Sequence, residues 1–128
     1  FDNGVINTIL GRESVNLNSP EAGNLFESNI YHELCCFKNY REDISLHYWR
    51  STSNFEVDFI LNEKVAVEVK LTKNVTSTHL KGLRAIKEEN ILKRYILISQ
   101  DKQSKVVDGI ELMYWADFIT LLWEKKIL

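Results

Sequence analysis

Residues 65–71 constrain the fold most, because apolar side chains there alternate with two charged ones. Glu68 and Lys70 fall between valines and a leucine at every second position, namely Val65, Val67, Val69 and Leu71. A period of two is typical of a β-strand with one apolar face. Charges on such a strand cost stability unless they are paired or bound to a metal ion. Two interpretations follow: an edge strand with paired surface charges, or a functional site.

Residues 55–61 predict a neighbouring strand that brings a second carboxylate to this site. Phe55, Val57, Phe59 and Leu61 are expected on its apolar face, with Asp58 on the other. If residues 62–64 form a three-residue hairpin loop, Leu61 pairs with Val65 and Asp58 lies opposite Glu68. Opposed Cβ atoms are roughly 5 Å apart. Two carboxylates at that spacing repel each other unless a cation lies between them, and both oxygens could reach one Mg²⁺.

A helix before the strands adds a third carboxylate. Ser19 suits a helix cap, Pro20 the first helical position and Glu21 the positive end of the dipole. The helix should run to about Phe37. One of its faces is apolar apart from a single acid, Glu27, and consists of Gly23, Glu27, Ile30, Tyr31 and Leu34. Glu27 either faces the charged site or reaches water at the edge of this stripe.

The remaining segments predict an α/β fold. Residues 39–43 form a polar break, and residues 45–50 alternate as a strand that precedes a turn at 51–54. Residues 76–78 cap a helix of about a dozen residues, residues 95–98 form a buried strand, a short strand lies near 110–113 and a final helix near 116–125. The expected core is αβββαβ, a mixed central sheet flanked by helices. The first three strands are antiparallel, and the fourth is parallel to the third.

Composition favours one domain preceded by a lead-in. The chain has 128 residues, and we expect a lead-in over residues 1–18 and a single domain over 19–128. Because the first residue is Phe1 rather than Met, we expect a piece of a longer protein. No apolar run reaches the ~18 residues of a membrane span. Cys35 and Cys36 lack zinc-site spacing, and with His32 they fit ordinary helix residues of a cytoplasmic protein.

Charge is distributed unevenly along the chain. Between Lys70 and Arg94 there are seven basic and two acidic residues, a net charge of +5, which leaves −7 for the rest of a chain whose total is −2. A positive segment beside a carboxylate site suits a phosphate-rich substrate. The alternative is a solvated helix face.

Taken in order, these features resemble the PD-(D/E)XK nuclease superfamily, whose core is restriction-endonuclease-like. The chain is more closely similar to the domain of unknown function at the C-terminal end of many bacterial and archaeal AAA+ ATPases. The matching segments are Phe1-Asp2-Asn3-Gly4, Gly23-Asn24-Leu25-Phe26-Glu27 with Glu33-Leu34, Tyr48-Trp49-Arg50, Glu56-Val57-Asp58-Phe59-Ile60 and Val67-Glu68-Val69-Lys70. The Pro of the motif is missing, because Glu56-Val57 stands before Asp58.

The resemblance implies a role for each site residue. Asp58 and Glu68 would bind Mg²⁺ or Mn²⁺, with the Val69 carbonyl as a further ligand, and Glu27 would bind the ion directly or through water. Lys70 would orient or help deprotonate the attacking water and neutralise phosphate charge. These roles fit phosphodiester hydrolysis, which needs activated water and stabilised negative charge.

Four basic residues are candidates for contacts to a nucleic-acid backbone: Arg50, Lys73, Lys81 and Arg84. Arg50 ends the first strand near the carboxylates and could hold a phosphate. Its alternative is a structural ion pair with Glu56 or Asp58.

Three functions are therefore considered. The first is a metal-dependent endonuclease that acts on DNA, similar to Holliday junction resolvase-type enzymes. The second is a non-enzymatic module that recognises nucleic acid or protein for an ATPase module of the same full-length chain. The third is an assembly domain that docks through Trp115, Phe118, Leu122 and Trp123, residues that also suit a core. The chain has no phosphate-binding loop of the Gly-x-x-x-x-Gly-Lys-Ser/Thr type, so no ATP site of that type is expected.

Overall fold

The computed structural model describes residues 4, 14, 16–41 and 43–128. Most of the expected lead-in over residues 1–18, including Phe1 to Asn3 of the first matching segment, lies outside these residues. The elements are α2 (Pro20–Arg41), β1 (Leu46–Arg50), β2 (Glu56–Leu61), β3 (Val65–Val69), the 3₁₀ helix η1 (Ser77–Leu80), α3 (Lys81–Glu88), β4 (Arg94–Ser99), β5 (Lys105–Val107), β6 (Ile110–Tyr114) and α4 (Trp115–Trp123).

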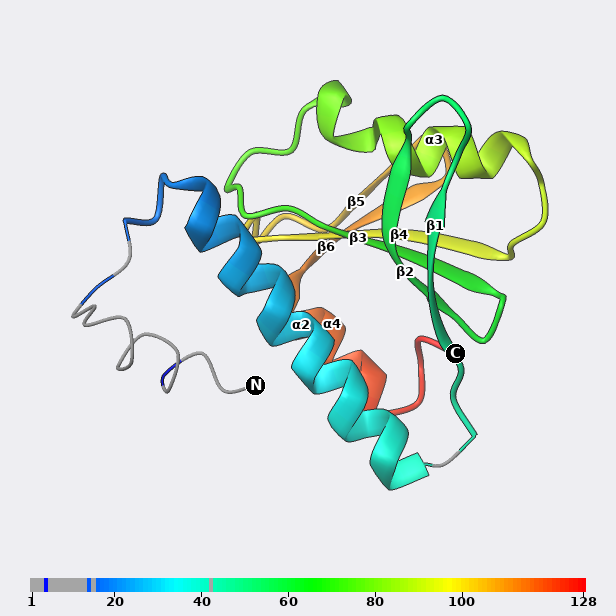
Figure 1. The fold of residues 1–128 in the computed structure, drawn as a ribbon, viewed down its shortest axis with the longest axis horizontal. Coiled ribbons are helices and arrows are strands. Elements are labelled where there is room, and N and C mark those ends of the chain that lie inside the picture. The colour runs from blue at the N-terminus through cyan, green and yellow to red at the C-terminus, as the bar shows by residue number, and fades with distance from the viewer. Residues whose placement is uncertain (1–3, 5–13, 15, 42) are drawn as a thin grey trace.

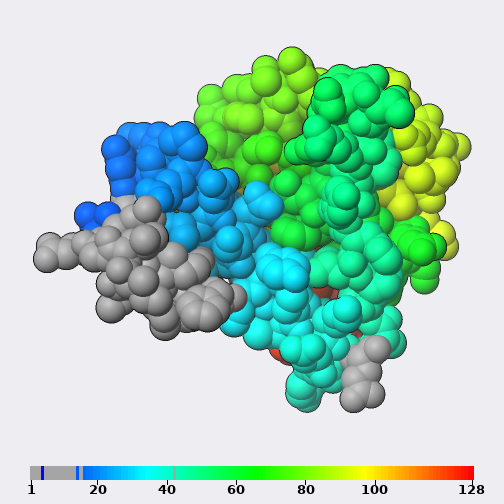
Figure 2. Space-filling model, viewed as in Figure 1, coloured from blue at the N-terminus to red at the C-terminus, as the bar shows by residue number. Residues whose placement is uncertain are grey.

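A mixed sheet forms the middle layer of the fold (Figure 1). Its strand order is β1-β2-β3-β4-β6-β5. The first three strands are antiparallel neighbours, β3, β4 and β6 run parallel, and β5 is antiparallel to β6. The predicted α/β class, the αβββαβ order and the parallel pairing of β3 with β4 are therefore confirmed. In Figure 2, α2 lies in front as a blue-to-cyan ridge beside the green atoms of the β1–β2 region.

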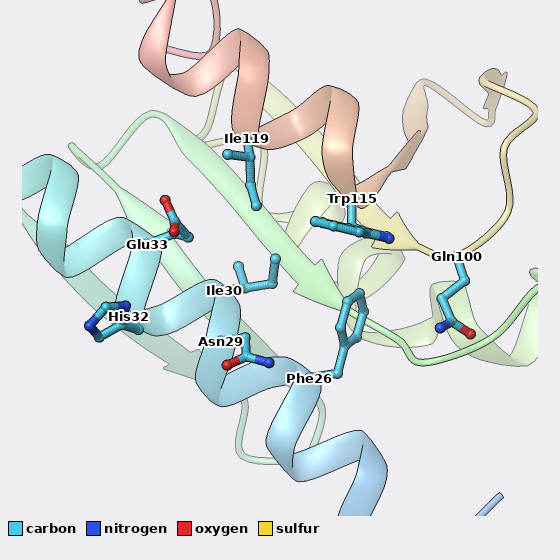
Figure 3. Close-up of a pocket in the computed structure, with 8 residues that line it drawn as sticks. All are labelled: Phe26, Asn29, Ile30, His32, Glu33, Gln100, Trp115 and Ile119. Carbon is cyan, nitrogen blue, oxygen red and sulfur yellow. The ribbon is translucent and has the colours of Figure 1, made fainter. Parts of the chain in front are cut away.

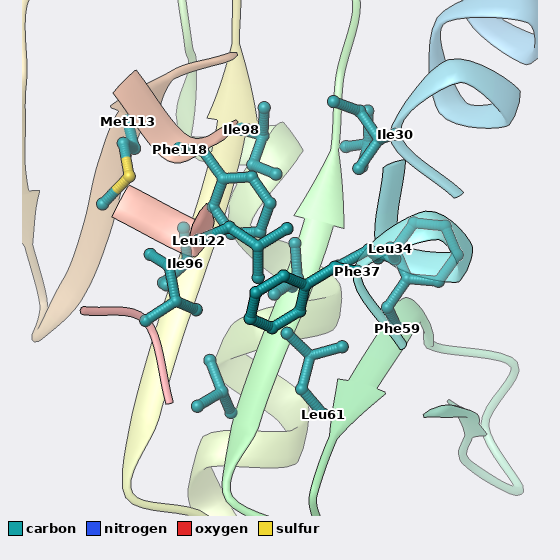
Figure 4. Close-up of a cluster of buried hydrophobic side chains, with 14 of the residues drawn as sticks. Ile30, Leu34, Phe37, Phe59, Leu61, Ile96, Ile98, Met113, Phe118 and Leu122 are labelled. Carbon is teal, nitrogen blue, oxygen red and sulfur yellow. The ribbon is translucent and has the colours of Figure 1, made fainter. Parts of the chain in front are cut away.

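Two apolar cores hold the three layers together. The first lies between the sheet and the pair α2 and α4, and its members include Ile30, Leu34, Phe37, Phe59, Leu61, Ile96, Ile98, Phe118 and Leu122 (Figure 4). The second lies between the opposite face and α3, and its members include Val57, Ile60, Ala66, Leu80, Leu83, Ile86 and Leu97. The predicted apolar stripe of α3 is buried as expected. Because β3 and β4 contribute to both cores, charged groups on β3 are largely shielded from solvent.

Helix α2 begins as predicted but ends later. The Ala22 N–H donates to the Ser19 hydroxyl at 3.3 Å, which caps the helix before Pro20. The polar break expected from Asn39 is wrong, because the helix continues to Arg41. Basic residues in its last turn favour the negative end of the helix dipole. In the same turn the Tyr40 ring packs against the Trp123 ring, with 5.9 Å between their centroids. This contact stabilises the last turn of the helix.

A bulge between β1 and β2 overturns one predicted face. His47 pairs with Ile60, but Trp49 pairs with Val57, so β2 carries one extra residue. We expected Val57 and Phe59 on one face. Instead Phe59 joins the core under α2, whereas Val57 joins the core under α3. Strict alternation fails because the bulge changes the direction of side chains on either side of it.

The hairpin between β2 and β3 has the predicted register. Leu61 pairs with Val65 and Phe59 with Val67, across a loop of residues 62–64. Asn62 and Glu63 have φ angles of 50° and 53°, as tight hairpin loops require. The Asn62 side chain also accepts the Ser45 N–H at 2.8 Å, which ties the loop to the strand on its other side.

Strand β5 was not predicted, although a signal was present. It is a three-residue edge strand joined to β6 by Asp108-Gly109, whose φ angles are 53° and 73°. This Asp-Gly pair is a strong hairpin signal. The turn is held from α3, because the Arg84 guanidinium bonds the Asp108 carboxylate at 2.7 Å and Lys87 donates to the Asp108 carbonyl. Within the described part of the chain, no helix is both long and apolar enough to cross a membrane.

Candidate active site

The site lies just beyond the last backbone pair of β2 and β3, Phe59 with Val67, where side chains contact the backbone of the opposite strand. Continuing the register beyond Phe59 and Val67 would place Asp58 opposite Glu68, as predicted. The Val69 N–H donates to Asp58 Oδ2 at 2.8 Å, and the Asp58 N–H points at Glu68 Oε2 at 3.4 Å. Each carboxylate is therefore anchored to the backbone of the opposite strand. This arrangement fixes both acids at the same end of the hairpin.

Glu68 and Lys70 lie on the same side of β3, as their spacing predicted. Lys70 Nζ is 2.5 Å from Glu68 Oε1, in a close ion pair. Glu68 is only 5% exposed, whereas the Lys70 side chain is 39% exposed and opens to solvent. The Lys70 backbone N–H donates to the Ile98 carbonyl at 2.9 Å, so β4 supports the lysine from the other side. A buried carboxylate thus has a cation that is still accessible to a ligand.

Burial and mutual repulsion set the protonation of the two acids. Burial, followed by the charge of Asp58, raises the pKa of Glu68 to about 7, although Lys70 opposes this shift. Burial also raises the pKa of Asp58, against the Val69 N–H and Lys70. Burial lowers the pKa of Lys70, but the surrounding carboxylates outweigh it and leave that pKa above its ordinary value. The lysine therefore stays charged, whereas the raised pKa values make the acids around it hold their protons more tightly than ordinary carboxyl groups do.

Glu27 reaches the same site from α2. Burial is the largest cause that raises the pKa of Glu27, and the Asp58 charge adds to it, whereas Lys70 lowers it. Glu27 therefore lies within electrostatic range of both residues. The helix positions it through Ile30 and Leu34, which are 1% and 2% exposed and anchor α2 on the sheet. The charges of Asp58 and Lys70 act on Glu27, and its role at an ion stays a prediction.

The donor set suits a divalent ion that keeps part of its water. Among the described residues, no group of three or more His, Cys, Asp or Glu side chains is arranged to hold an ion, so Glu27, Asp58 and Glu68 do not form a closed cage. Mg²⁺ does not need one, because it is commonly bound through one or two carboxylates and several waters. Asp58 and Glu68 provide two adjacent carboxylates whose repulsion a cation relieves. Two adjacent carboxylates are compatible with such an ion, and binding of Mg²⁺ or Mn²⁺ stays a prediction.

Arg50 is held by Glu56, one of the two acids considered as its ion-pair partner. Its Nε atom lies 3.3 Å from Glu56 Oε1, and its guanidinium also donates to Asn54 Oδ1 at 3.1 Å. Of the two alternatives for Arg50, the structural ion pair with Glu56 is present. The charge of Glu56 itself raises the pKa of Glu27 and of Asp58.

The other basic candidates differ in position. Arg84 bonds Asp108 and the Ser77 hydroxyl, at 2.7 Å and 2.6 Å, so its guanidinium serves the fold. Lys81 begins α3 on the opposite side of the sheet from α2, and it is exposed. Lys73 is exposed in the segment that follows β3, three residues after Lys70. Lys73 is thus the closest of these three to Lys70 along the chain.

The residues of the predicted docking stripe on α4 differ in burial. Phe118 and Leu122 are buried under α2. Trp123 is 40% exposed, packs edge-on against Phe37 at 5.2 Å, and donates from its indole N–H to Glu33 at 3.2 Å. Most of the stripe is therefore core, which was the other interpretation given to these residues. Cys35 and Cys36 form no disulfide.

Comparison with known proteins agrees with the resemblance to a domain of unknown function. One family matches residues 22–118, and the match includes Glu27, Asp58, Glu68 and Lys70. The search of curated proteins and the search of solved structures give no match. The matched segment runs from the first turn of α2 into α4 and so includes every strand of the sheet. The chain therefore belongs to the family described as Domain of unknown function (DUF4143).

Proposed function

We propose that this domain is a metal-dependent nuclease of the PD-(D/E)XK type that hydrolyses phosphodiester bonds in nucleic acid, with DNA as its substrate. The observation that carries the proposal is the group formed by Asp58, Glu68 and Lys70 at one end of the β2–β3 hairpin. Lys70 is 2.5 Å from Glu68, and Asp58 is held by the Val69 N–H at 2.8 Å. Together with Glu27 on α2, these residues have the order and types found in that superfamily.

A divalent ion would be held by Asp58 and Glu68, with the Val69 carbonyl as a further ligand and Glu27 bound through water. Such an ion, when bound, supplies an acidified water and stabilises charge on the phosphate oxygens. The protein contributes two carboxylates whose positions are fixed by backbone N–H groups. Because burial raises the pKa of Glu68 to about 7, binding an ion near neutral pH displaces a proton from this residue.

Lys70 would act on the scissile phosphate and the attacking water. Its ammonium group is charged, half exposed and close to the carboxylates, so it can neutralise a phosphate oxygen that approaches from solvent. It can also orient a water for attack while Glu68 holds the ammonium group in place. Arg50 and Lys73 are candidates to contact the neighbouring phosphates, and Arg50 would have to exchange its bond to Glu56 for a phosphate. We also propose an AAA+ ATPase module of the same full-length chain as the partner that delivers the strand.

The test is cleavage of branched, single-stranded and duplex DNA by the purified chain in Mg²⁺ or Mn²⁺. The Asp58→Asn, Glu68→Gln variant removes both carboxylates from the site. A matched control, Glu88→Gln with Asp117→Asn, changes the same number of charges at exposed positions on α3 and α4. We expect the site variant to lose roughly a hundredfold or more in rate, whereas the control retains it.

Two outcomes would contradict the proposal. Cleavage that the site variant retains would point to a contaminating nuclease. No cleavage, with equal binding of DNA by the wild-type chain and the site variant, would indicate a recognition module that uses this fold without the chemistry.

A further inference from the structure

A hollow beside the candidate active site has no role in the proposed hydrolysis. Its volume is about 350 Å³, which is within the range of small-molecule sites, about 300 to 1,000 Å³. It lies between α2, the end of β4 and the start of α4 (Figure 3). Its lining includes Phe26, Ile30, Glu33, Gln100, Trp115 and Ile119. Figure 3 shows Phe26, Trp115 and Gln100 toward one end, Glu33 toward the other, and the two isoleucines between them.

The hollow is adjacent to the candidate active site through two elements. On α2, Phe26 immediately precedes Glu27, so the two side chains leave the helix about 100° apart. On the sheet, the Lys70 N–H bonds the Ile98 carbonyl and the Gln100 N–H bonds the Thr72 carbonyl. Gln100 therefore lies two residues after Ile98, the residue that supports Lys70. Two residues span about 7 Å along a strand.

A second, smaller hollow extends the first toward the end of β3. Its volume is about 210 Å³, and it shares Phe26 and Gln100 with the first. It is also lined by Leu71, the residue after Lys70, and by Leu25 on α2. Because Lys70 and Leu71 alternate along the strand and point to opposite faces, a strand of nucleic acid that contacts Lys70 would cross the end of β3 to reach the hollows on the α2 side.

The lining identifies the kind of group that fits. Phe26 and Trp115 offer flat aromatic surfaces, and the Gln100 amide and the Glu33 carboxylate can hydrogen-bond the edge of a heterocycle. Glu33 is itself positioned by the Trp123 indole at 3.2 Å. None of the described residues that line the larger hollow is Lys or Arg, so it does not attract a phosphate group. Aromatic faces with amide and carboxylate groups suit a neutral nucleobase.

We infer that this hollow receives one unpaired nucleobase of a strand whose backbone passes Lys70. The base stacks on Trp115 and Phe26, and Gln100 contacts its edge. This inference rests on the nuclease function proposed above and gives that function a substrate class: nucleic acid with at least one unpaired base next to the cleavage site. A base within a continuous duplex cannot enter, because its edge and its faces are already occupied.

The inference can be tested by binding alone, without cleavage. All proteins carry Asp58→Asn and Glu68→Gln, which remove two negative charges and prevent hydrolysis. The probe is a 12-nucleotide strand with one central 2-aminopurine, whose fluorescence falls on stacking. Comparison ligands are the same strand with an abasic site, the same strand in a duplex, and free 2-aminopurine deoxyriboside. The added substitutions are Trp115→Leu, Trp115→Phe and Gln100→Ala, with Trp49→Phe on the opposite core as the matched control.

We expect Trp115→Leu to weaken binding of the single strand about tenfold and to abolish the quenching. Trp115→Phe retains most of both effects because a ring remains, and Trp49→Phe changes neither. Gln100→Ala weakens binding roughly fivefold through a lost hydrogen bond. Because Gln100 belongs to neither apolar core, this variant tests the hollow even if Trp115→Leu fails to fold, as thermal melting would reveal. The strand with an abasic site carries no 2-aminopurine and gives no signal, while its other bases can still enter the hollow, so it serves as the control for quenching.

Three results would overturn the inference: no binding of the strand, equal binding by the Trp115→Leu, Gln100→Ala and parent proteins, or free nucleoside bound as tightly as the strand. The last would assign the hollow to a small heterocycle. The two proposals also fail separately. Quenching that depends on Trp115, in a protein whose wild type cleaves nothing, keeps the base site and rejects the nuclease. Cleavage by the wild type, with no effect of Trp115 on binding or quenching, keeps the nuclease and rejects the base site.

Discussion

Glu68 shows how much the surroundings of one residue change its chemistry. Its position on an alternating strand predicted a charged face, but not that the carboxylate would be 5% exposed between two apolar cores. Burial is the main cause that raises its pKa to about 7, and the adjacent Asp58 charge adds to it. A group that titrates near neutral pH makes both folding stability and metal affinity depend on pH in the physiological range.

Replacing Glu68 by Gln should change how stability depends on pH. The pKa of Glu68 is about 7 in the folded chain against 4.5 for an ordinary glutamate, so the folded state binds the proton more tightly. Its contribution is therefore most favourable below pH 4.5 and is lost as pH rises toward 7. Glu68→Gln should remove this loss, which is on the order of 2 to 3 kcal/mol. Urea unfolding from pH 5 to 8, without metal ions, measures it.

The control for this experiment is Glu88→Gln, an exposed acid on α3. Its profile should follow that of the wild type. A wild-type stability that stays constant or rises from pH 5 to 7, relative to Glu68→Gln, would show that Glu68 ionises normally in the folded chain.

At the scale of elements, two helical glycines differ in the space around them. A Cβ atom on Gly82 of α3 would lie 2.1 Å from the Glu56 carbonyl oxygen, so α3 packs directly on the backbone of β2. A Cβ atom on Gly23 of α2 would meet nothing within 4 Å. The first glycine is required by close packing next to the site, and the second only lowers helix propensity.

Alanine at these two positions should therefore have opposite effects. Gly23→Ala should stabilise the chain by up to about 1 kcal/mol through helix propensity. Gly82→Ala gains the same propensity but forces α3 away from β2, and overpacking of this kind costs about 1 to 3 kcal/mol or more. Thermal or urea unfolding of both variants provides the comparison. Equal stabilisation by the two substitutions would show that α3 can move away from β2 without cost.

For the whole molecule, the carboxylates of the site should link stability to divalent ions. An ion that binds only the folded chain at ten times its dissociation constant adds about 1.4 kcal/mol, or about 3 to 6 °C in melting temperature for a chain of this size. We expect this increase with Mg²⁺ or Mn²⁺ in the wild type, larger at pH 8 than at pH 6 because Glu68 must lose its proton.

The matched protein for this measurement is the Asp58→Asn, Glu68→Gln variant, which should show no increase beyond that caused by ionic strength. The same increase in both proteins would mean that the ions bind elsewhere. Because the measurement does not depend on cleavage, it tests the metal site separately from the nuclease function.

The sequence alone determined the features that depend on neighbouring residues. The alternation around Glu68 and Lys70 predicted the strand and its charged face, the three-residue loop predicted the pairing of Leu61 with Val65, and Ser19 predicted the helix start. Local period and turn chemistry are properties of the segment itself, so no distant contact is needed to predict them. For the same reason the order of the described helices and strands followed from the sequence, apart from the edge strand β5.

Only the tertiary structure decided which groups meet across long separations. The bulge sends Val57 into the core under α3, and Arg84 bonds Asp108, which is 24 residues away. The hollow by Trp115 exists because α2, β4 and α4 converge there. Such features depend on packing among distant segments, whose contacts leave no periodic pattern in the chain. The sequence thus proposed the residues of the site, whereas packing set their burial, their protonation and the space beside them.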